Sequence, residues 1–201
     1  MADIVHRYTG VIYRDLVDDT KLKHRDYFHM KYVYMLAHEW LMEEGYADRS
    51  DKNFPEEFYL HRFTQKNGEE MWIWWRLVKH QNSFVRWDLD IDWHVIGMKD
   101  VEVMHNGLKY KANHGEPEFK IYAKVIVDPP AQWKNNWFLR GLFELFWTRM
   151  YKAQLDNYRK EFYRDLFKFK DAMKTYFKLR TYLPETEGQQ FWLDEDFNIQ
   201  R

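Results

Sequence analysis

The sequence predicts an α+β protein: a strand and a helix, then a five-strand antiparallel meander, then one long C-terminal helix packed on the sheet. Three patterns predict this order. Apolar residues recur at helical spacing between Tyr27 and Glu44, they alternate with polar ones from Phe58 to Val127, and the run from Asn135 to Thr181 contains no proline. Turn sequences divide the alternating region into its strands.

The chain is long enough for one domain with a substantial core, and 19% of its residues are aromatic. We assign residues 1–183 to this domain, because Pro184 ends the last helical pattern. Residues 184–201 are a predicted tail, which is acidic and contains Phe191, Trp192, Leu193 and Phe197. Such a tail either folds back on the basic stretch from Asp156 to Arg180, which we favour, or serves as a docking peptide.

Short elements precede the meander. Val11-Ile12-Tyr13 predicts a strand, and charged residues follow it through Asp26. Tyr27 to Glu44 predicts the first helix, which Gly45 ends because glycine readily adopts the left-handed conformation of a C-cap. Ala47 to Pro55 is a polar loop.

Turn sequences set the register of the meander. Asn67–Gly68 is typical of a two-residue hairpin turn, because both residues tolerate a positive φ. It pairs Lys66 with Glu69, Phe63 with Trp72 and Leu60 with Trp75. The turn Gln81-Asn82-Ser83 places Met71, Ile73, Trp75 and Leu77 opposite Trp93, Ile91, Leu89 and Trp87, and Arg76 opposite Asp88. Asn106–Gly107 pairs Glu102 with Lys111 and Val103 with Tyr110.

Alternation from Trp87 to Trp93 assigns the two faces of the sheet, since side chains of a strand point to opposite faces in turn. Trp87, Leu89, Ile91 and Trp93 face the core. The outward face carries Tyr59, His61, Phe63, Trp72, Trp74, Asp90 and Asp92. Tryptophans beside acidic residues are unusual on a solvated surface, so we expect a terminal segment or a partner to cover this face.

The long helix, with Asn135 or Asn136 as its N-cap, has two apolar stripes. The first consists of Phe138, Leu139, Leu142, Phe143, Phe146, Trp147, Met150 and Tyr151. The second consists of Leu155, Tyr158, Phe162, Leu166, Phe169, Met173 and Tyr176, and lies roughly 130° around the axis from the first. The helix therefore either bends near Lys152 to Asn157, or its second half reaches past the sheet to another partner.

Two interpretations of the second stripe follow. Both stripes belong to the core of one domain, or the second stripe is an interface with a protein partner or a second copy of the chain. A peripheral membrane contact through Trp137 to Trp147, where Arg140, Arg149 and Lys152 accompany the aromatic residues, is the least favoured. That segment is too short to span a bilayer.

Little in the sequence predicts catalysis, so we expect a non-enzymatic protein without a cofactor. No cysteine is present, which excludes disulfides and thiolate chemistry, and no phosphate loop or nucleophile elbow occurs. Asp88, Asp90 and Asp92 invite comparison with a metal site, but alternate strand residues lie about 6.6 Å apart, which is too wide for one ion. We assign no metal site. The net charge of −1 argues against nucleic-acid binding.

The order of elements resembles the helix-grip type of ligand-binding fold, in which a curved sheet wraps a long C-terminal helix. This resemblance implies a carrier that binds an apolar small ligand between the sheet and the helix. We rank first an interaction or structural protein that uses the long amphipathic helix as an oligomer or partner interface. The N-terminal residues lack the apolar region of a signal peptide, so a cytoplasmic location is expected.

Overall fold

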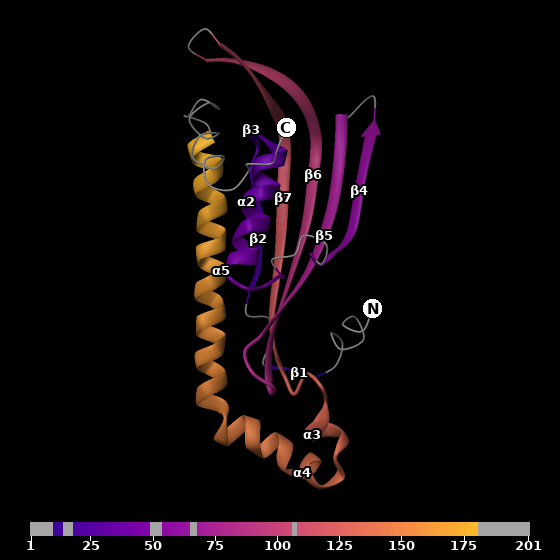
Figure 1. Cartoon of the computed structure of the whole chain (residues 1–201), viewed down its shortest axis with the longest axis vertical. Helices are drawn as coiled ribbons and strands as arrows, with labels where there is room; N and C mark the ends of the chain where they lie inside the picture. Colours follow the sequence, from indigo (N-terminus) through magenta and orange to yellow (C-terminus); the bar gives the residue numbers. More distant parts are fainter. Residues whose placement is uncertain (1–9, 14–17, 49–53, 65–67, 106–107, 181–201) are drawn as a thin grey trace, which may run out of the picture.

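The computed structural model of the chain describes residues 10–13, 18–48, 54–64, 68–105 and 108–180. Within these residues an antiparallel sheet of seven strands carries helices on one face, and a long helix follows the sheet (Figure 1). The predicted α+β class is therefore confirmed. The predicted tail at 184–201 and parts of two predicted turns, at Asn67 and Asn106–Gly107, lie outside the described residues.

The sheet has the strand order β1-β7-β6-β5-β4, and β2 and β3 also pair with β7. The strands are β1 Val11–Ile12, β2 Asp18–Lys23, β3 Asp26–Phe28, β4 Glu56–Thr64, β5 Gly68–His80, β6 Val85–His105 and β7 Leu108–Val127. The sequence predicts one strand before the first helix, whereas three short strands follow one another along the edge of β7. Strand β2 is rich in charge because it lies at the edge of the sheet, where alternation is weak.

The meander contains four strands, β4 to β7, where the sequence predicts five. β6 and β7 each run without interruption through a register shift between Ile96 and Lys99. Gly97 adopts a φ of 63° at this bulge, which bends the strand without ending it. Beyond the bulge, the predicted pairs Glu102 with Lys111 and Val103 with Tyr110 are confirmed.

The register of β5 with β6 differs from the predicted one by two residues. Ile73 lies opposite Trp93, and Arg76 opposite Asp90 rather than Asp88. The turn is wider than predicted because the side-chain oxygen of Asn82 accepts hydrogen bonds from the backbone N–H groups of Phe84 and Val85, each at 2.8 Å. A shift of two residues leaves every side chain on its face. Trp87, Leu89, Ile91 and Trp93 are accordingly buried, as predicted.

The register of β4 with β5 differs by three residues, and this odd shift exchanges the faces of β4. Leu60 pairs with Trp72 and Phe63 with Glu69, since residues 65–67 separate the last pair instead of the two predicted turn residues. Tyr59, His61 and Phe63 therefore do not share the outward face with Trp72 and Trp74. They lie on the face of Ile73 and Met71, and all three are exposed because β4 is the edge strand.

Two helices cover the inner face of the sheet: α2, Met30–Glu43, and α5, Lys152–Arg180 (Figure 1). Gly45 follows α2 with a φ of 74°, as its predicted role in ending the helix requires. The predicted helix from Asn135 to Thr181 is broken. α3, Gln132–Asn135, ends at the first residue of this range, and α4, Trp137–Leu145, a π-helical segment η2, Phe146–Met150, and α5 follow it.

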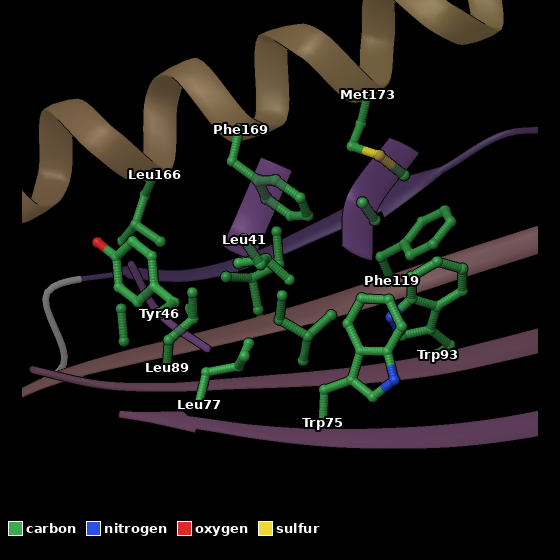
Figure 2. Packing of buried hydrophobic residues seen from close by; sticks show 14 of the residues in the cluster. Leu41, Tyr46, Trp75, Leu77, Leu89, Trp93, Phe119, Leu166, Phe169 and Met173 are labelled. Atoms are coloured by element: carbon green, nitrogen blue, oxygen red, sulfur yellow. The ribbon is translucent and has the colours of Figure 1, made fainter. Parts of the chain in front are cut away.

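Aromatic side chains join α5 and α2 to the sheet. The ring of Phe162 stacks on Trp87, with centroids 4.8 Å apart and an interplanar angle of 3°. Phe169 contacts Trp40 of α2 at 5.1 Å. Figure 2 shows Leu166, Phe169 and Met173 pointing from the helix toward the strands. The core thus lies between α5, α2 and the inner face of β5, β6 and β7.

We expect Phe162→Ala to lower the free energy of unfolding by about 3–5 kcal/mol, because it removes the ring stacked on Trp87 and leaves a cavity. Urea denaturation measures this change. Phe167→Ala is the matched control, since Phe167 lies on the same helix but is 58% exposed; its effect should stay within about 0.5 kcal/mol. Equal losses for the two variants would contradict the described packing.

Acid stability depends in part on Glu118, whose Oε1 lies 2.7 Å from Nζ of Lys21. This hydrogen bond, despite opposing burial, lowers the pKa of Glu118 in the folded protein. The resulting stabilisation is complete above the ordinary carboxyl range and is lost as pH falls through the depressed pKa. Lys21→Met should therefore weaken the loss of stability on acidification, measured by thermal unfolding across the acid range. Lys31→Met, at an exposed site on α2, should leave the acid profile unchanged.

Candidate interaction surface

The second stripe of the long helix lies in the core of the chain. The predicted interface residues Leu155, Phe162, Leu166, Phe169 and Met173 are buried, and Tyr158 and Tyr176 are partly buried against the same core. The assignment of these residues to a partner interface is therefore corrected. Their partners are the sheet and α2 of the same chain, so the interpretation that both stripes belong to the core holds for the second stripe only.

Most residues of the first stripe, in contrast, are not fully buried. We call Trp137–Met150, which comprises α4 and η2, the docking arm. Among its stripe residues only Phe143 is buried, while Leu139, Phe146 and Trp147 are partly covered. Figure 1 shows α4 at one end of the molecule, turned away from the axis of α5. The sequence correctly places the two stripes on different sides, but it does not reveal which of them meets the sheet.

An apolar face remains exposed on the docking arm, and it is formed by Trp137, Phe138, Leu142, Leu145 and Met150. Trp137 is 89% exposed, Met150 74% and Phe138 63%. Trp137, Gly141 and Leu145 follow one another at intervals of four residues, and Phe138 and Leu142 form the adjacent row, so they share one side of the helix. Exposed apolar side chains that share one side of a helix are typical of contact sites.

A π-helical turn changes the direction of the chain between the arm and α5. The backbone N–H of Tyr151 donates to the carbonyl of Phe146 at 2.9 Å, which is the wide bond of a π-turn. Such turns are a recognised cause of sharp kinks. The bend therefore lies at Phe146 to Tyr151, a few residues before the predicted position at Lys152 to Asn157. We call this junction the elbow.

The turn between β5 and β6 holds the elbow. Asn82 donates from Nδ2 to the hydroxyl of Tyr158 at 3.1 Å and, more weakly, to that of Tyr151 at 3.4 Å. The hydroxyl of Tyr13 donates to Oδ1 of Asp156, which also lies on α5, at 2.8 Å. Burial raises the pKa of Tyr151 above its ordinary value. These bonds fix the start of α5 on the sheet.

The same turn supports the beginning of the arm. The backbone N–H of Asp128 donates to the carbonyl of Phe84 at 2.8 Å, and the carboxylate of Asp128 caps α3 by accepting from the N–H groups of Gln132 and Trp133. Asn136 caps α4 by accepting from Phe138 and Leu139, as predicted. The ring of Phe84 contacts Trp133, Phe143, Phe146 and Tyr151 edge-on. The arm is thus held at both ends while its apolar face points outward.

Polar residues border the apolar face. Arg140 and Glu144 lie one turn apart on the arm, and Arg149 and Lys152 lie at its C-terminal end. All four side chains are exposed. Basic residues therefore outnumber acidic ones on this part of the molecule, although the whole chain has a net charge of −1.

The outward face of the sheet is a second aromatic surface, smaller than predicted because β4 contributes different residues. Trp72 stacks on His94, and Trp74 stacks on Phe58. Trp74 is exposed, whereas Trp72 is partly covered. The guanidinium of Arg76 lies 5.6 Å from the centroid of the Trp74 ring. It also donates a hydrogen bond to Oδ1 of Asp92 at 2.5 Å, so Arg76 contacts both an aromatic and an acidic residue of this face.

Asp88, Asp90 and Asp92 of β6 each have a basic partner. Asp88 is buried and accepts two hydrogen bonds from Arg86, Asp90 lies 3.7 Å from Nζ of Lys124, and Asp92 bonds Arg76. These pairs occupy carboxylate oxygens that a cation would need. In the described part of the chain, no group of three histidine or acidic residues is placed to hold a metal ion.

We expect Asn82→Ala to lower the free energy of unfolding by about 1–3 kcal/mol, since it removes the acceptor of two backbone N–H groups and the donor to two tyrosines. Thermal or urea unfolding measures the loss. Ser83→Ala alters the neighbouring exposed turn residue and should have little effect. If both variants unfold like the wild type, Asn82 does not secure the elbow.

No described helix is long and apolar enough to cross a membrane. The chain matches no protein-family model, and a search of curated proteins found no match.

Proposed function

We propose that this protein is a non-enzymatic interaction protein that binds an apolar surface through its docking arm. The observation that carries the proposal is the exposed apolar face of Trp137, Phe138, Leu142 and Leu145 on one side of α4, which is followed by the exposed Met150 of η2. The proposal keeps the class of function expected from the sequence, an amphipathic helix acting as an interface. It moves the interface from the stripe of α5 to the arm.

The free energy available from burying these side chains favours a binding site over exposed apolar residues without a function. Full burial of one large apolar side chain stabilises a complex by about 1.5–3 kcal/mol. Five partly to largely exposed residues therefore give the arm a driving force of roughly several kcal/mol for binding, before the cost of association. Trp137 and Phe138 are also of the residue types that dominate binding hot spots and buried anchors.

The way in which the arm is held supports the same function. Asp128 caps α3, which precedes the arm, and Asn82 bonds Tyr158 of α5, which follows it. The ring of Phe84 contacts Phe143 and Phe146 of the arm itself. A helix fixed in this way loses little conformational freedom when a partner binds, which lowers the cost of binding.

A carrier for an apolar small ligand, the alternative implied by the resemblance to helix-grip folds, has less support. It requires room between the sheet and the long helix. Bulky side chains that include Trp75, Trp93, Phe119 and Phe169 occupy this space and are buried (Figure 2). Tryptophan and phenylalanine in these positions fill a core rather than line a void.

Site-specific photo-crosslinking in cells that produce the full chain tests the proposal. A photo-reactive phenylalanine analogue at Leu145, on the apolar face, should give a discrete adduct. The same analogue at Phe167, an exposed apolar residue of α5 outside the arm, should not. Intact-mass analysis reads out the adduct and distinguishes protein from lipid.

A second variant tests whether formation of the adduct at Leu145 depends on other residues of the apolar face. Trp137→Asp places a charge where the side chain is 89% exposed, so folding should be preserved and the adduct at Leu145 should decrease at least tenfold. Circular dichroism confirms that the variant is folded. Equal adducts at positions 145 and 167, or an adduct indifferent to Trp137→Asp, would refute the arm as an interface.

A further inference from the structure

The charges around the apolar face indicate what kind of surface the arm meets. Arg140, Arg149 and Lys152 are exposed beside it, and Glu144 is the acidic residue of the same stretch. The chain as a whole is almost neutral, so this excess of positive charge is local. A complementary surface would be apolar at its centre and negatively charged at its border.

The composition of the arm also matches a helix that lies in the plane of a membrane interface. Such helices place Trp, Phe and Leu on one face and Lys or Arg beside it, and they enter the bilayer about 5–10 Å deep. Trp137, the most exposed large apolar residue in the described part of the chain, is of the type that prefers the boundary between lipid tails and headgroups. α4 has nine residues, which suits a surface contact and is far short of a span.

A second copy of the chain fits this surface less well. Each arm carries three basic residues, Arg140, Arg149 and Lys152, and one acidic residue, Glu144, so two arms packed face to face would each bring a net positive charge to the contact. Like charges that face each other across an interface oppose association. The single Glu144 of each arm does not neutralise them.

We infer that the docking arm binds an anionic lipid bilayer surface, with its apolar face inserted between headgroups and its basic residues on the lipid phosphates and carboxylates. This inference rests on the proposed function, because it names the partner of the same surface. Each basic residue near an anionic membrane strengthens binding about fivefold. The three bases together therefore account for a factor on the order of a hundred.

Co-sedimentation of the full-length protein with vesicles tests the inference. Phosphatidylcholine vesicles with about one third phosphatidylserine should bind the wild type, and pure phosphatidylcholine vesicles should bind it much more weakly. The triple variant Arg140→Gln, Arg149→Gln, Lys152→Gln should lose on the order of a hundredfold in affinity for the anionic vesicles. Binding by the wild type should weaken as salt is raised.

Matched variants separate the apolar contribution from the charge. Trp137→Ser with Met150→Ser should reduce partitioning at least tenfold, because both side chains are largely exposed in the free protein and buried in the bilayer. Phe167→Ser removes an exposed aromatic residue from α5 and should bind like the wild type. Circular dichroism of each variant checks that the fold is retained.

The outcomes also separate this inference from the proposed function. Absence of binding to anionic vesicles at low salt would overturn the lipid partner, and so would binding that is equal on neutral vesicles or indifferent to the triple variant. If a protein adduct still forms at Leu145 in cells, the proposed function stands with a protein as partner. If neither vesicles nor a crosslinked partner engage the arm, both proposals fail.

Discussion

The stacking of Phe162 on Trp87 is the contact on which the rest of the structure depends. It seats the apolar stripe of α5 on the inner face of the sheet, and α2 closes the same core through Trp40. Because this stripe occupies the inner face, α4 turns away at the elbow and keeps its own apolar residues exposed. The candidate interaction surface is therefore a consequence of how the core is filled.

The sequence predicted the faces of the sheet better than its register. Between β5 and β6 the true register differs by two residues, and Trp87 to Trp93 keep their predicted sides because side chains alternate with a period of two. Between β4 and β5 the difference is three residues, which moves Tyr59, His61 and Phe63 to the other face. The length of each turn decided whether the side chains kept their predicted faces or exchanged them.

The sequence could not reveal which stripe of the long helix meets the sheet. Helical periodicity shows that a face is apolar, and the offset between the stripes indicated a bend, but neither identifies the surface that a stripe contacts. The contacts that settle it join residues far apart in the chain, such as Tyr13 with Asp156. Strand β2 was missed for a related reason: its partner lies about a hundred residues away, and its charged residues lack a clear alternation.

The side chain of Asn82 makes the orientation of the arm depend on the register of the β5–β6 hairpin. The oxygen of Asn82 closes the turn between β5 and β6, and its nitrogen reaches the two tyrosines at the elbow. A hairpin formed out of register would carry Asn82 away from Tyr151 and Tyr158, so the long helix could not seat at the angle that exposes α4. The chain thus presents its apolar face in a fixed direction only after the sheet has formed with its native register.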